Sequence, residues 1–156
     1  MFEKLKQEEY NLNASKARDI SRLAQYNLIF KKITEEAEYG NKKAVIYKFR
    51  KCILPEVVEK LENDGFNIEI TSDCFTISWE NVKNCGRKAF KIRELSILSQ
   101  YNLTIERIND DAKAGEVSTE IFDMYPEVVE KLKNKGFDIV IPTTSMIGKV
   151  SWKNIS

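Results

Sequence analysis

The sequence predicts an α+β protein that is a tandem duplication of one α-β-α-β-β unit. The main observation is the heptapeptide Pro-Glu-Val-Val-Glu-Lys-Leu, which occurs unchanged at 55–61 and at 126–132. Apolar residues at helical spacing precede each copy, and alternating apolar residues follow it. Further matched segments lie at 25–28 and 100–103, at 65–66 and 136–137, and at 77–79 and 150–152.

These matches divide the chain into four parts. We expect an N-terminal arm or short helix at 1–13, a first unit at 14–81, a linker at 82–88 and a second unit at 89–154. A unit of this size buries only about 60% of its extended-chain surface, so each unit would be marginally stable alone. We therefore expect the units to pack together with a pseudo-two-fold relation, each with a small mixed three-stranded sheet on two helices.

Each unit is expected to begin with a long helix. In the first unit the pattern runs from Ser15 to Tyr39 and Gly40 supplies the stop. The predicted apolar face comprises Ala17, Ile20, Leu23, Ala24, Tyr26, Phe30, Ile33 and Ala37. The second unit repeats the face 75 positions later, at Ile92, Leu95, Leu98, Tyr101, Ile105, Ile108 and Ala112, ending at Gly115.

A strand, a shorter helix and two more strands should follow. The first strand is predicted at 44–49 with Val45, Tyr47 and Phe49 on its buried side, and its counterpart lies at 117–122. Pro55 suits the first position of the second helix, and Gly65 can end that helix while Phe66 folds back on its last turn. The remaining strands are expected at 68–70, 75–79, 139–141 and 149–152.

Composition excludes several classes of function. The net charge of +1 comes from 25 basic and 24 acidic residues, so no global field would hold nucleic acid or a membrane surface. The chain has no histidine, which excludes Ser-His-Asp and Cys-His catalysis. The polar N-terminus is unlike a signal peptide and no run of 18 apolar residues occurs, so we expect a cytoplasmic protein.

The residues that could hold metals or disulfides do not form a convincing site. Three cysteines, Cys52, Cys74 and Cys85, have no paired spacing and are expected to be reduced thiols. Consecutive carboxylates on a helix point in different directions and usually face water. This applies to Asp110, Asp111 and Glu116, and to Glu35, Glu36 and Glu38. We expect no catalytic residue, no metal and no cofactor.

Matched polar residues are the candidate ligand-binding positions. They are Arg18, Gln25, Tyr26 and Asn27 in the first unit, and Arg93, Gln100, Tyr101 and Asn102 in the second. An aromatic face with amide groups suits a planar ligand or a peptide backbone, and the arginine suits phosphate or carboxylate. The alternative is structural: the tyrosines pack in the core, and the amides stabilise a helix bend or the interface between units.

Two tryptophans end the last strand of each unit. Trp79 and Trp152 are expected to close the core or to anchor an interface. Local basic clusters around 42–51 and 83–93 contain aromatic residues, but no nucleic-acid-binding motif accompanies them.

A resemblance suggests a class of function. The pattern of a long helix ending in Ala-x-x-Gly (37–40), a Val-x-x-Leu-x-x-x-Gly-Phe segment (58–66) and Ile-x-Trp (77–79) resembles a class of short bacteriophage-encoded accessory proteins. The resemblance implies a non-enzymatic binding protein of the host cytoplasm. Its partner would be a host defence protein that it blocks or a signalling nucleotide that it sequesters. The alternatives are a self-associating virion or tail-assembly protein, and a nucleic-acid-binding accessory protein.

Overall fold

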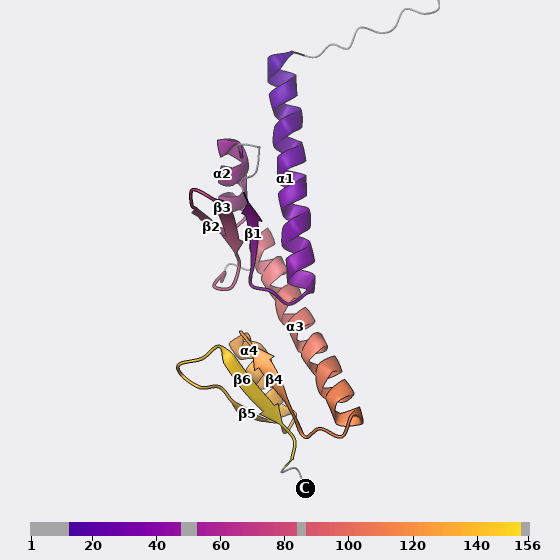
Figure 1. Ribbon diagram of the computed structural model, residues 1–156. Helices are drawn as coiled ribbons and strands as arrows, with labels where there is room; N and C mark the ends of the chain where they lie inside the picture. The colour runs from indigo at the N-terminus through magenta and orange to yellow at the C-terminus, as the bar shows by residue number, and fades with distance from the viewer. Residues whose placement is uncertain (1–12, 48–52, 84–86, 154–156) are drawn as a thin grey trace, which may run out of the picture.

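The computed structural model describes residues 13–47, 53–83 and 87–153, which form two units joined by a long helix (Figure 1). The first unit contains α1 (Ala14–Glu38), β1 (Lys43–Tyr47), α2 (Pro55–Asn63), β2 (Asn67–Ile70) and β3 (Cys74–Ser78). The second contains α3 (Lys88–Lys113), β4 (Ser118–Phe122), α4 (Pro126–Asn134), β5 (Asp138–Val140) and β6 (Ile147–Ser151). The α+β class and the predicted order of elements are confirmed. The predicted arm at 1–13, except Asn13, lies outside the described residues, as do Phe49, Cys52 and Cys85.

Both sheets are antiparallel, so the predicted mixed sheet is wrong. The strand orders are β1-β3-β2 and β4-β6-β5, and every hydrogen-bonded pair is antiparallel. The helical crossover through α2 does join two strands of the same direction, but β3 lies between them. The registers correspond in the two sheets, with Ala44 opposite Ile77 in the first and Thr119 opposite Val150 in the second.

The core of the first unit lies between one face of its sheet and both helices. Ile33 of α1, Val57 and Leu61 of α2 and Ile77 of β3 are each 0% exposed and belong to one apolar cluster. The buried side of β1 is the opposite of the predicted one, because Ala44 is buried while Tyr47 is 60% exposed. Alternation alone leaves two choices of face, and here the smaller residue packs under the helices.

The second helix of each unit ends as predicted. Gly65 has φ of +97°, its N–H donates to Glu62, and the N–H of Phe66 donates to the carbonyl of Leu61 at 3.1 Å. This hydrogen-bond pair is the Schellman motif, which brings the buried Phe66 back over the last turn. Gly136 and Phe137 repeat the arrangement in the second unit.

Only the C-terminal half of α1 is buried. Its core residues are Tyr26, Ile29, Ile33 and Ala37, whereas Ile20 is 62% and Leu23 58% exposed. The predicted apolar face is therefore wrong for the first turns, which extend past α2 in Figure 1. In α3, by contrast, Ala89 and Ile92 lie in the core of the first unit and Ile108 lies in that of the second.

The units are arranged head to tail, not around the predicted pseudo-two-fold axis. The end of α1 at Gly40 lies against Gln100, and a two-fold would place Gly115 against Gln25 in the same way. A Cβ added at Gly115 would meet no atom within 4 Å. The first turns of α3 complete the core of the first unit, and this fixes the direction of stacking.

Candidate functional site

The two units meet where the end of α1 lies on the middle of α3. Gly40 has φ of +77°, and an added Cβ would lie 2.8 Å from the Cα of Gln100. A glycine is needed here for both reasons, since a side chain would be strained and would also clash with the backbone of α3. The close approach places the carbonyls of Gly40 and Asn41 on α3.

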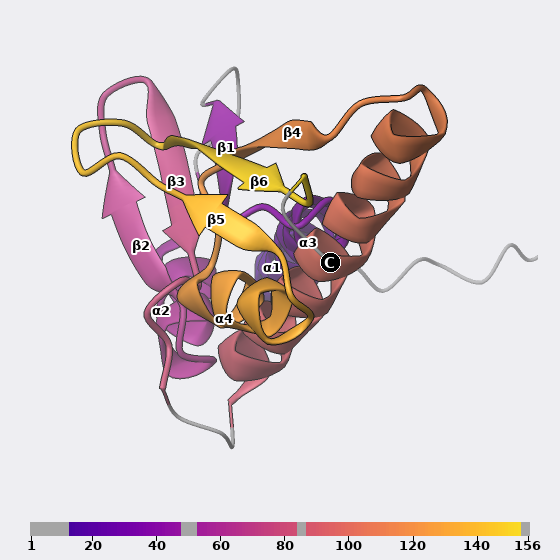
Figure 2. The same ribbon diagram turned by 90° about the horizontal axis from the view of Figure 1, so that it is seen from below.

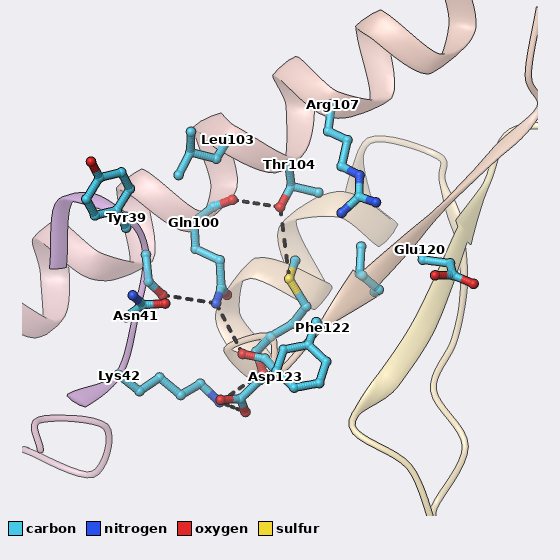
Figure 3. Close-up of a pocket in the computed structure, with 13 residues that line it drawn as sticks. Tyr39, Asn41, Lys42, Gln100, Leu103, Thr104, Arg107, Glu120, Phe122 and Asp123 are labelled. Carbon is cyan, nitrogen blue, oxygen red and sulfur yellow. Dashed lines mark hydrogen bonds and ion pairs between the residues drawn. The ribbon is translucent and has the colours of Figure 1, made fainter. Parts of the chain in front are cut away.

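Side chains of α3 and of Trp79, the residue after β3, bind these carbonyls. The Gln100 amide N–H groups donate to Gly40 O at 3.3 Å and to Asp123 O at 3.2 Å, while its carbonyl accepts from the N–H of Tyr125 at 2.7 Å. The Ser96 hydroxyl and the Trp79 indole N–H both donate to Asn41 O, at 2.5 and 3.1 Å. Gln100 therefore joins three segments of chain at the junction (Figure 3).

Lys42 crosses from the first unit to the second. Its side chain is 9% exposed, and its ammonium lies 2.9 Å from Asp123 and 3.0 Å from Glu80. The ammonium also lies 5.0 Å from the centre of the Tyr125 ring, within cation–π distance. Burial by itself would lower the pKa of Lys42, but the hydrogen bonds to the two carboxylates and their negative charges together outweigh burial and leave that pKa raised. Burial raises the pKa of the Tyr125 phenol to about 12, so both groups keep their protons at neutral pH.

A groove of about 240 Å³ opens beside this network. Three exposed apolar side chains border it: Tyr39 at 72%, Phe122 at 63% and Leu103 at 43% exposure. Arg107 and Glu120 lie at the end away from Lys42 (Figure 3). We call the surface formed by Tyr39, Leu103, Arg107, Glu120 and Phe122 the junction groove.

The sequence-predicted ligand residues of the first unit lie elsewhere, between α1 and α2. Arg18 binds the Glu56 carboxylate at 2.6 Å, and the Gln25 carbonyl accepts from the N–H of Leu54 at 2.9 Å. The Tyr26 hydroxyl donates to Asp64 at 2.5 Å and accepts from Lys88 at 3.1 Å. Burial, with the Asp64 hydrogen bond, raises the pKa of Tyr26. Asn27 is exposed.

The second set repeats part of this arrangement. Arg93 binds the Glu127 carboxylate, as Arg18 binds Glu56, and Gln100 binds Tyr125 as Gln25 binds Leu54. Tyr101 is half-buried under the Lys131 ammonium, 4.0 Å away, and Asn102 is exposed. In each unit the arginine and glutamine thus hold the long helix to the start of the heptapeptide helix. Of the eight candidates, only Gln100 borders the junction groove, and ligand binding by the others stays a prediction.

The groove residues were not found from the sequence. The matched polar residues hold the long helices to the heptapeptide helices, whereas Lys42 is unmatched, because its counterpart in the second unit is Val117. This difference between the units is the feature of the sequence that points to the junction. One chain contains one such junction, so the residues that form it need not occur in both units. Trp79 is fully buried at this junction, and Trp152 packs half-buried against the second core.

Comparisons with protein-family models, curated proteins and solved structures gave no match. Within the described ranges, no three His, Cys, Asp or Glu side chains gather as metal ligands. None of the described helices is long and apolar enough to cross a membrane.

Proposed function

We propose that the protein is a non-enzymatic binding protein that holds an apolar segment of another protein in the junction groove. The observation that carries this proposal is the exposure of Tyr39, Phe122 and Leu103 around one hollow. Exposed apolar patches of this kind are typical of interaction sites, and aromatic residues with an arginine are common anchors. Arg107 and Glu120 supply polar contacts at the rim.

The size of the junction groove favours a protein segment over a nucleotide as its occupant, although an adjoining hollow of about 490 Å³ shares Lys42 and Phe122 with it. Pockets that enclose small ligands usually measure about 300–1,000 Å³, and the junction groove measures about 240 Å³. The polar residues that would form paired nucleotide pockets are also engaged, because Arg18 and Arg93 bind carboxylates. The resemblance to small bacteriophage proteins suggests a host defence protein as the class of partner.

We also infer that the two units arose by tandem duplication. The identical heptapeptide, the offset of 75 positions in the long helices and the equal strand orders support this origin. The arginine–glutamate and glutamine–backbone contacts recur at matched positions as well.

A displayed library of random peptides tests the groove with a defined probe. We expect selected peptides to carry apolar anchors and to lose about tenfold in affinity for Phe122→Ser, since burying most of a Phe side chain contributes about 1–2 kcal/mol. Tyr47→Ser is the matched control, because Tyr47 holds the equivalent position on β1, is 60% exposed and does not border the groove. Equal peptide affinities for the wild type and Phe122→Ser would contradict the proposal.

Native mass spectrometry tests the alternative that the protein sequesters a nucleotide. The purified protein would be exposed to a metabolite extract of infected cells and its intact mass measured. A nucleotide-sized adduct that Arg18→Ala or Arg93→Ala removes, and that Phe122→Ser keeps, would support sequestration instead. We expect no such adduct.

A further inference from the structure

The contacts between the two units run in one direction, so each unit leaves one of its two faces unused. In the first unit, the N–H of Ala89 at the start of α3 donates to the carbonyl of Asp64 at 3.0 Å. A Cβ added at Gly65 would lie 2.9 Å from the Arg87 side chain, whereas one added at the equivalent Gly136 would meet nothing within 4 Å. The face that receives α3 in the first unit is therefore open in the second.

Burial of matched residues shows the same asymmetry. Phe66 and Trp79 are 3% and 0% exposed under the first turns of α3. Their counterparts Phe137 and Trp152 are only half-buried, and Val117, which stands at the position of Lys42, is 46% exposed. We call the surface formed by Gly115, Val117, Gly136, Phe137 and Trp152 the open face.

The first turns of α1 are the matching unused surface. In α3 the residues that pack on the first unit include Ala89 and Ser96, both 0% exposed, and Ile92 at 6%. Seventy-five positions earlier stand Ala14, Ala17 and Ser21, of which Ala14 and Ser21 are exposed and Ala17 is half-buried. Ile20, at the position of the core-packed Leu95, is 62% exposed. We call Ala14, Ala17, Ile20 and Ser21 the leading face of α1.

We propose that the leading face of α1 in one copy docks on the open face of a second copy, reproducing the internal junction between chains. The identical alanine and serine fit this geometry, because Ala89 lies beside Gly65 and the Ser96 hydroxyl binds the Asn41 carbonyl. In the docked pair, Ala14 lies beside Gly136 of the other copy and the Ser21 hydroxyl donates to its Glu116 carbonyl.

One contact at the junction is made by different residue types inside the chain and in the proposed contact between chains. Inside the chain, Lys42 of the first unit lies over the Tyr125 ring of the second, where charge meets an aromatic face. Between chains, the equivalent residues are Val117 and Leu54, so an apolar side chain meets an apolar side chain. Both partners of the contact have changed together, and the pair remains compatible.

This interface is heterologous, because two different surfaces of the chain meet. A heterologous contact does not end at a dimer, since each added copy presents a new open face, and growth continues unless a ring closes. The proposal is independent of the junction groove, because neither the leading face nor the open face shares a residue with it.

Sedimentation velocity of the full chain over a wide concentration range tests the docking. We expect the mass of the wild type to rise with concentration through dimer and larger species. Ser21→Arg blocks the leading face and Val117→Asp weakens the open face, so each variant alone should stay monomeric. Leu98→Arg is the matched control, since Leu98 is 53% exposed on α3 outside both surfaces, and this variant should assemble like the wild type.

Mixing the two blocked variants distinguishes this geometry from other modes of association. Ser21→Arg retains an intact open face and Val117→Asp retains an intact leading face, so the mixture should form a one-to-one dimer and nothing larger. Circular dichroism melts of both variants at low concentration should match the wild type and show that they fold. A wild type that is monomeric at every concentration, or association unchanged in both variants, would overturn the proposal.

Discussion

The two units have the same elements in the same order, yet equivalent residues lie in different surroundings. In the first unit the Arg18–Glu56 pair is solvated, with the arginine side chain 54% exposed. In the second unit Arg93 is 18% exposed, binds Glu127 and also donates to the carbonyl of Glu80 across the junction. The arginine of the second unit therefore makes a hydrogen bond that the arginine of the first unit lacks, because only the second unit has a neighbouring unit beside its arginine.

The largest difference in stability is expected between substitutions of the two tryptophans. Trp79→Ala should lower the free energy of unfolding by about 3–5 kcal/mol, because Trp79 is 0% exposed and its indole N–H binds the Asn41 carbonyl. Trp152→Ala should lower it by about half as much, since Trp152 is only half-buried. Urea denaturation at neutral pH and low protein concentration measures both values. Equal losses would show that the second unit is covered as completely as the first.

The second largest difference in stability is expected between substitutions of the two glycines that end the long helices. Gly40→Ala adds backbone strain of about 1–2 kcal/mol and a clash with α3 that raises the total to about 2–4 kcal/mol. Gly115→Ala carries only the strain, because its Cβ would meet nothing within 4 Å although its φ is +89°. Thermal and urea unfolding of the two variants tests this difference. A Gly115→Ala variant as unstable as Gly40→Ala would contradict the head-to-tail arrangement.

The smallest difference is expected between the two arginines, and it should depend on pH. Arg93→Ala removes hydrogen bonds to Glu127 and to Glu80, a loss of about 1–2 kcal/mol after allowing for the exposure of Glu127. Arg18→Ala should remain close to the wild type, since both of its groups are solvated. Denaturation of each variant at pH 7 measures the two changes.

The pH dependence follows from the Glu127 carboxylate. Burial would raise the pKa of Glu127, but the hydrogen bond from Arg93, the backbone hydrogen bond at Glu127 and the positive charges of Arg93 and Lys42 together outweigh burial and lower that pKa below its usual 4.5. A carboxylate with a lowered folded-state pKa stabilises the fold above its unfolded pKa and loses that contribution as pH falls through the folded value. The stability gap between the wild type and Arg93→Ala should therefore narrow below about pH 4.5. If the difference in stability between the wild type and Arg93→Ala stays constant down to pH 2, the whole effect of the substitution comes from the lost hydrogen bond to the Glu80 carbonyl.

Local features of the fold could be predicted from the sequence because they depend on neighbouring residues. The C-cap at Gly65 and Phe66 is one example, since a left-handed glycine followed by an apolar residue ends a helix by local hydrogen bonds. The side of β1 that is buried could not be predicted in the same way. Val45 and Tyr47 alternate as well as Ala44 and Ile46 do, and only the helices above the sheet decide between them.

The candidate site was less predictable than the fold. Matched residues such as Arg18 and Gln25 occur in both units and are candidate ligand positions from the sequence, but in the structure they hold α1 to α2. The junction groove lies beside a contact that only one unit can make, because Lys42 binds Asp123 and its counterpart in the second unit is Val117. No periodic pattern in the sequence identifies such a contact, because it joins segments about 80 positions apart.

By itself, the sequence determined the helices, most strand positions and the helix ends, because hydrophobic periodicity, glycine and proline act over a few residues. The tertiary structure alone decided that both sheets are antiparallel, that the units stack head to tail and that the first turns of α1 are exposed. These features follow from which apolar surfaces can be buried together. That choice depends on the shape of the whole assembled core, since the same amphipathic helix can pack on either of two neighbours.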